Sequence, residues 1–169
     1  MKLLFENWRG YLSEDGKTIF YHSTPPWQAE EVEAKGLKTG SEGIGFSIAG
    51  TWADKIYGTR PVYLSTKPGF GGDREYEGTI LEIDTTGLQL YPDLPTLVDF
   101  GAYVEEEEGM YWEYGTEPKE MKPFVDGDGM IYFEDLLTPG HPVANAVMKL
   151  TGTAVSLKDI SSDRIKIIS

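Results

Sequence analysis

The sequence predicts an α+β fold, and three observations support this class. Short runs rich in Ile, Val, Tyr and Thr, which favour strands, are separated by polar runs that end in glycine, which favour short helices. The 20 glycines and 10 prolines indicate many turns. The 169 residues fit one domain with one sizeable core. With no repeat or linker, we expect a single domain over 1–169, made of an N-terminal helix at 1–12 and an α+β body at 18–168.

Composition argues against several functional classes. The net charge of −13 argues against general nucleic-acid binding, which depends on lysine and arginine to neutralise phosphates. The absence of cysteine excludes disulfides, thiolate nucleophiles and cysteine-ligated zinc. No apolar run approaches the roughly 20 residues that span a bilayer, and Glu6 interrupts the apolar start that could otherwise form a secretion signal. We therefore expect a cytoplasmic protein without a membrane partner.

The expected elements follow from local patterns. Strands are predicted where β-prone residues cluster or alternate, at 18–21, 61–65, 79–84, 130–133, 153–157 and 164–168. Helices are predicted at 28–35, closed by Gly36, and at 51–56, capped by Thr51. The four glutamates at 105–108 fit a solvated face, and the aromatic run 110–114 fits a strand or a pocket wall. Residues 115–129 are expected to leave the core, and 143–150 is an apolar segment of unassigned structure.

His22 is the first candidate for chemistry. It ends the first predicted strand, after which Ser23 and Thr24 are expected to open a turn and two prolines stop the strand. A histidine between a rigid strand and a helix start is well placed for chemistry, because its charge changes near neutral pH. The alternative is a hydrogen-bonded histidine with a structural role only.

Several segments together resemble a known family. The chain carries Phe-Tyr-His-Ser-Thr at 20–24, a helix ending in Lys-Gly-Leu at 35–37, Pro-Val-Tyr-Leu-Ser at 61–65, Gly-Thr-Ile-Leu-Glu-Ile-Asp at 78–84, and Val-Ser-Leu-Lys-Asp-Ile-Ser-Ser-Asp-Arg-Ile at 155–165. This order resembles the ADP-ribosyltransferase-like superfamily of NAD-using proteins, over most of 18–90 and 151–168. The opening at 1–12 resembles a leader of marine phage proteins, which implies the cytoplasm of a phage host as the location.

The family resemblance implies a fold, a cofactor and a site. The fold would be a small split β-sheet with short flanking helices, with NAD in a cleft between its halves. His22 would hydrogen-bond a ribose hydroxyl and Tyr63 would stack on nicotinamide, so these two are the catalytic candidates. Ser23 and Thr24 would lie beside the nicotinamide amide, and Ser65 would complete the cofactor-binding set. The implied partners are this nucleotide and a macromolecular acceptor of ADP-ribose.

Departures from the family pattern leave a second hypothesis open. Ser23 stands where glycine is usual, and the strand at 151–155 lacks the glutamate that many transferases carry. Glu82 and Glu113 are acidic candidates from elsewhere, but neither occupies that motif position. A glycine-rich loop from Lys67 replaces the usual helix. The alternative is therefore a catalytically inactive, phage-type accessory or structural protein with the same fold.

Other motifs carry weaker signals. The glycine-rich stretch 41–50 has no phosphate-binding pattern and is expected to be a surface loop. Residues 124–135 partly match a calcium loop, but Phe124 occupies the first ligand position, so a glycine–aspartate turn is favoured over a calcium-stabilised interaction module. His141 lies in an expected turn, and its spacing from His22 is not that of metal ligands. We predict no metal site.

Overall fold

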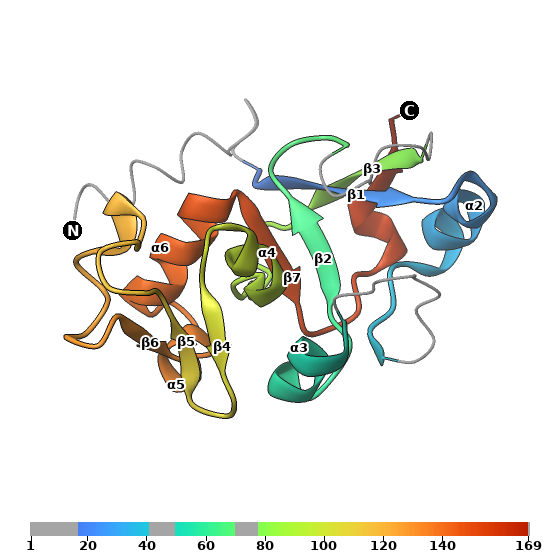
Figure 1. The fold of residues 1–169 in the computed structure, drawn as a ribbon. Coiled ribbons are helices and arrows are strands. Elements are labelled where there is room, and N and C mark those ends of the chain that lie inside the picture. Colours follow the sequence, from blue (N-terminus) through green and yellow to red (C-terminus); the bar gives the residue numbers. More distant parts are fainter. Residues whose placement is uncertain (1–16, 41–49, 70–77, 169) are drawn as a thin grey trace.

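The computed structural model describes residues 17–40, 50–69 and 78–168. The predicted helix at 1–12, the glycine-rich stretch at 41–49 and the loop residues 70–77 lie outside these ranges. The described part is α+β, with two antiparallel sheets and short helices (Figure 1). No helix within it is long and apolar enough to cross a membrane.

The larger sheet contains five antiparallel strands with β1 at its centre. The strands run in the order β7-β2-β1-β3-β8, and each coincides closely with a strand predicted from sequence. They are β1 (Ile19–Thr24), β2 (Val62–Ser65), β3 (Thr79–Asp84), β7 (Thr153–Ser156) and β8 (Ile165–Ile167). One expectation was wrong: Ser23 and Thr24 do not open a turn, because β3 pairs with both and continues β1 past His22.

The strands β1 and β2 separate from one another. β1 pairs with β3 at six positions but with β2 at only one, Tyr21 opposite Ser65. Paired residues share a face and side chains alternate along a strand, so Tyr21, Ser65 and Tyr63 lie on one face of the sheet. His22 lies on the opposite face. At the gap between β1 and β2, groups from both faces of the sheet can therefore meet.

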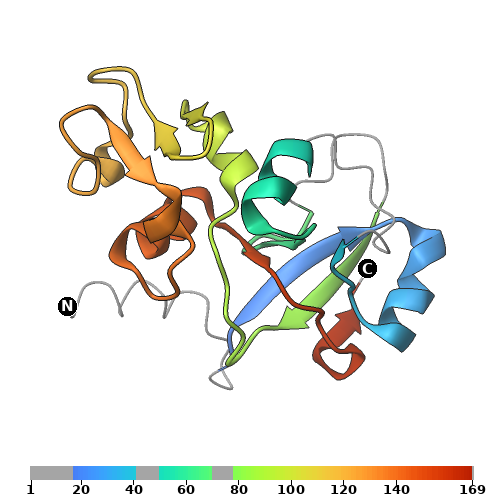
Figure 2. The same ribbon diagram turned by 90° about the horizontal axis from the view of Figure 1, so that it is seen from below.

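Each face of the sheet packs on a separate core. The face that holds Phe20 and Leu81 is covered by α2 (Pro26–Lys35) and by Ile160. Pro26 occupies the first turn of α2, where its missing N–H costs nothing, so this helix begins two residues before the predicted start. Figure 2 shows α2 (blue) and the small sheet (yellow to orange) at opposite ends of the molecule.

The second core joins the other face to a smaller lobe. Val155 and Tyr63 pack there against helices and a three-stranded sheet. Two expectations hold in this lobe. The glutamates at 105–108 are exposed, and the aromatic run at 110–114 begins in a strand. The elements of this lobe are α3 (Gly50–Tyr57), α4 (Leu94–Asp99), β4 (Tyr103–Glu105), β5 (Gly109–Tyr111), a 3-10 turn at Lys119–Met121, β6 (Met130–Tyr132), α5 (Phe133–Leu136) and α6 (Pro142–Thr151). In the larger sheet, a further 3-10 turn at Ser162–Arg164 precedes β8.

The segment that resembles a calcium loop is a tight turn. Asp126 accepts hydrogen bonds at Oδ1 from the main-chain N–H groups of Asp128 and Met130, and at Oδ2 from the Tyr132 hydroxyl. The Gly129 N–H closes the turn on the Asp126 main-chain oxygen. The carboxylate therefore serves the turn, as the glycine–aspartate interpretation expected. In the described ranges, no group of three or more His, Asp and Glu side chains is arranged to hold a metal ion.

Candidate functional site

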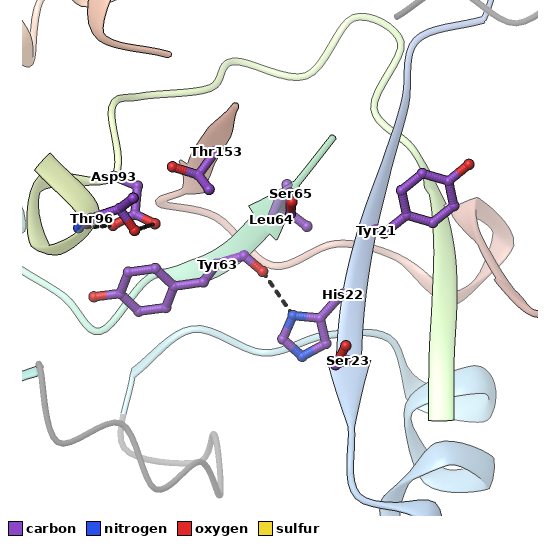
Figure 3. A pocket seen from close by; sticks show the side chains of 9 residues that line it. All are labelled: Tyr21, His22, Ser23, Tyr63, Leu64, Ser65, Asp93, Thr96 and Thr153. Carbon is purple, nitrogen blue, oxygen red and sulfur yellow. Dashed lines mark hydrogen bonds between the residues drawn. The ribbon is translucent and has the colours of Figure 1, made fainter. Parts of the chain in front are cut away.

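A pocket of about 170 Å³ lies where β1 and β2 separate. Four of the five predicted site residues line it, and five further residues complete its wall. Figure 3 shows these side chains, which come from β1, β2, β7 and the start of α4. The lining residues are Tyr21, His22, Ser23, Tyr63, Leu64, Ser65, Asp93, Thr96 and Thr153.

His22 links the two separated strands through its side chain. Its Nδ1 lies 2.8 Å from the main-chain oxygen of Tyr63. Because a carbonyl only accepts, the proton is on Nδ1, and a neutral ring then offers Nε2 as an acceptor. The partial burial of the ring lowers the pKa of His22, and the hydrogen bond to Tyr63 only partly offsets this decrease. No residue in the described ranges bonds to Nε2.

The phenol of Tyr63 does not point toward His22. Figure 3 shows the ring running away from the imidazole, below Asp93 and Thr96. Its hydroxyl is buried and has no hydrogen-bond partner among the described residues, and the same holds for Oδ1 of Asp54. Burial, together with the carboxylates of Asp93 and Asp54, raises the pKa of Tyr63 well above its ordinary value. The phenol therefore stays protonated. His22 bonds to the main-chain oxygen of Tyr63 and not to this phenol.

Of the three predicted serine and threonine residues, two line the pocket and one does not. Ser23 and Ser65 line the pocket, and the Ser65 Oγ accepts a hydrogen bond from the Lys67 main-chain N–H at 3.1 Å. Thr24 is buried, and its hydroxyl faces Gln28 at 3.4 Å, at the start of α2. The structure therefore brings both serines to the site but leaves Thr24 outside the pocket lining.

The alternative acidic and basic candidates also lie outside the pocket lining. Glu82 stands opposite Tyr21 in the sheet register, on the same face. Glu113 is exposed in the smaller lobe. His141 caps α6 by accepting the Val143 N–H at Nδ1, and its Nε2 lies 3.5 Å from Asp135 Oδ1. None of these three contributes a group to the pocket wall.

Asp93 is the carboxylate that the sequence did not single out. It is only 5% exposed and caps α4, with Oδ1 accepting the Thr96 N–H at 3.0 Å and Oδ2 accepting the Thr96 hydroxyl at 2.7 Å. Burial raises its pKa, which these hydrogen bonds oppose. The buried Tyr57 hydroxyl holds the backbone on both sides of it, donating to Pro92 O at 2.6 Å and accepting from Leu94 N at 2.9 Å.

The sequence around Asp93 signals a helix start but not a site. An aspartate three residues before a threonine, with a proline between them, is a capping pattern. Only the fold places this cap beside Ser65 and beside Thr153, which stands opposite Ser65 in the β2–β7 register. No local signal in the sequence could have revealed that contact.

The chemistry of the pocket rests on its own groups. No protein-family model, curated protein or solved structure matches the chain. The pocket offers an acceptor nitrogen on His22, four small hydroxyl side chains and one carboxylate. No lysine or arginine is among its lining residues. Such a set suits an uncharged or cationic ligand that carries hydrogen-bond donors.

Proposed function

We propose that the chain is an ADP-ribosyltransferase-like domain that binds NAD, or an ADP-ribosyl compound, in the pocket between β1 and β2. One observation carries the proposal: where the two strands separate, beside Ser23, Tyr63 and Ser65, His22 offers an acceptor nitrogen that has no partner among the described residues. The family resemblance implies a split sheet with NAD in a cleft between its halves, and this pocket lies between two separated strands.

The hydrogen-bonding pattern of His22 fits a ribose hydroxyl. Nδ1 is committed to Tyr63 O, so Nε2 can accept from a ligand O–H. The lowered pKa keeps the ring neutral near pH 7, and protonation would remove this acceptor. Ser23 and Ser65 add hydroxyl groups that can bond the carboxamide of a nicotinamide ring.

The size of the pocket fits one end of the dinucleotide. A cavity of about 150 Å³ holds one benzene-sized ring, whereas pockets that enclose whole drug-sized ligands measure about 300–1,000 Å³. A pocket of about 170 Å³ therefore takes the nicotinamide ring and leaves the diphosphate and adenosine outside it. Lys67, exposed and two residues beyond Ser65, is a cation available to the diphosphate.

ADP-ribose transfer is the further step of the proposal. The bond between ribose C1′ and the nicotinamide nitrogen breaks, nicotinamide leaves with the bonding pair, and an acceptor nucleophile adds to C1′ and loses its proton. A carboxylate near the ribose stabilises the cationic transition state. Thr153, not a glutamate, occupies the β7 position opposite Ser65, and this observation favours the second candidate, a domain that binds without transfer.

Titration with NAD tests the proposal and separates the two candidates. We expect saturable binding by calorimetry that is weakened at least tenfold in His22→Asn, with Thr116→Asn, on an exposed turn, as a control. Release of free nicotinamide that is lost in Tyr63→Ala supports transfer. Binding without release supports the inactive domain. If NAD does not bind to the wild type, both candidates are wrong.

A further inference from the structure

The pocket wall contains one buried carboxylate, that of Asp93. Asp93 is 5% exposed, and no lysine or arginine in the described ranges forms an ion pair with it. Both of its oxygens accept hydrogen bonds from Thr96, an arrangement that suits the ionised form. A buried charge is costly unless a partner compensates it. A cation entering the pocket would supply that compensation.

The capping role of Asp93 does not require a charge. The N-cap position of α4 needs a side-chain oxygen that accepts the Thr96 N–H, and asparagine or serine serves equally well there. The charge is therefore a separate property of this position. This charge acts on any molecule that occupies the pocket, because Asp93 lines the pocket together with Ser65 and Tyr63.

We propose that Asp93 makes the pocket selective for a positively charged aromatic ring, so that the protein binds NAD more tightly than NADH. This inference rests on the proposed function. The nicotinamide ring of NAD is flat and carries a positive charge, whereas the ring of NADH is neutral. The pocket has room for one such ring, and the Tyr63 side chain adds an aromatic group that attracts a cation. Asp93 thus acts as a specificity-determining residue.

The overall negative charge of the chain would also weaken the binding of NADH relative to NAD, and a control variant separates this effect from that of Asp93. NADH carries one more negative charge than NAD, and a net charge of −13 repels it more strongly wherever it binds. Asp99 lies on the same helix as Asp93 but is exposed. Asp99→Asn therefore removes the same charge from nearly the same place, where solvent screens it.

Calorimetric dissociation constants for NAD and NADH test the inference. In the wild type and Asp99→Asn we expect NAD to bind at least tenfold more tightly than NADH. In Asp93→Asn, which keeps the cap, the ratio should fall to within about twofold through loss of NAD affinity. A ratio near one in the wild type, or an unchanged ratio in Asp93→Asn, overturns the inference while leaving NAD binding intact. If neither nucleotide binds, the proposed function fails with it.

A second measurement needs no variant, so it holds even if Asp93→Asn does not fold. The probes are 1-methylnicotinamide, a cation, and nicotinamide, its neutral parent, titrated into the wild-type chain and followed by NMR. We expect the cation to bind at least fivefold more tightly and to shift the Thr96 amide, which bonds to Asp93. Equal affinities for the two rings overturn the inference.

Discussion

The Nδ1–H of His22 donates a hydrogen bond to the main-chain oxygen of Tyr63 across the gap between β1 and β2, at 2.8 Å. The bond replaces a ladder hydrogen bond that the separated strands cannot make. It also fixes the tautomer that leaves Nε2 as an acceptor. The structural role of His22 therefore uses Nδ1, and the proposed ligand contact uses Nε2.

His22→Ala and His22→Asn separate these two roles. Alanine leaves the Tyr63 carbonyl without its donor, and we expect the free energy of unfolding to fall by about 1–2 kcal/mol. The side-chain N–H of asparagine can take the place of Nδ1–H, so His22→Asn should lose less than about 0.5 kcal/mol. Urea denaturation measures both. Equal losses in the two variants would contradict the assigned hydrogen bond.

The lowered pKa of His22 predicts a pH-dependent stability. The unfolded chain takes up this proton near the ordinary value of 6.5, whereas the folded chain takes it up at lower pH. Between these two values the unfolded state binds more protons, so the stability falls as pH decreases through this window and levels off below the folded pKa.

Urea denaturation at pH 7.5 and 5.5 checks this sign. We expect the wild type to lose more stability on acidification than His22→Asn, which has no ring to protonate. A smaller loss in the wild type than in the variant would reverse the sign and contradict the account.

Strand positions were predictable because the pattern is local. Period-two alternation and bounding turn residues located β3 over its whole length. The end of β1 was misplaced, since pairing with β3 outweighs the turn preference of Ser23 and Thr24, and β4 was not predicted. The segment 143–150 was left unassigned, although Pro142 at the start and Gly152 at the end mark the α6 helix. Those signals were present in the sequence.

The pocket was only half predictable. His22, Ser23, Tyr63 and Ser65 belong to two strand motifs and were expected together. Asp93 belongs to a helix cap, and its place in the wall depends on how the smaller lobe docks on the sheet. Likewise, the opposite faces of His22 and Tyr63 follow from the one-pair register between β1 and β2, which no local pattern specifies.

Tyr57→Phe should destabilise the chain around Asp93. The variant removes the hydroxyl that bonds Pro92 O and Leu94 N, so two buried main-chain groups lose a partner, at a cost of about 1–3 kcal/mol. The Leu94 amide should exchange faster with deuterium, as measured by NMR. Tyr114→Phe, at a fully exposed tyrosine, is the control and should change neither quantity. An unchanged Leu94 amide would contradict this role of Tyr57.

Tyr63→Phe should be tolerated. The Tyr63 hydroxyl is buried without a partner in the described residues, so its removal should leave stability unchanged or raise it by up to about 1 kcal/mol. Tyr63→Ala removes a ring that packs against the second core and should cost roughly 2–4 kcal/mol. Thermal unfolding compares the two. A loss above 1 kcal/mol in Tyr63→Phe would show that the hydroxyl has an energetic role in the fold.

The central claim is that NAD binds in the pocket between β1 and β2, and an NMR titration of the backbone amides with NAD tests it most directly. We expect the shifts to concentrate at residues 21–23, 63–65 and 93–96, and to weaken strongly in His22→Asn while that variant stays folded. Shifts absent from these three segments, or unchanged in folded His22→Asn, would contradict the claim.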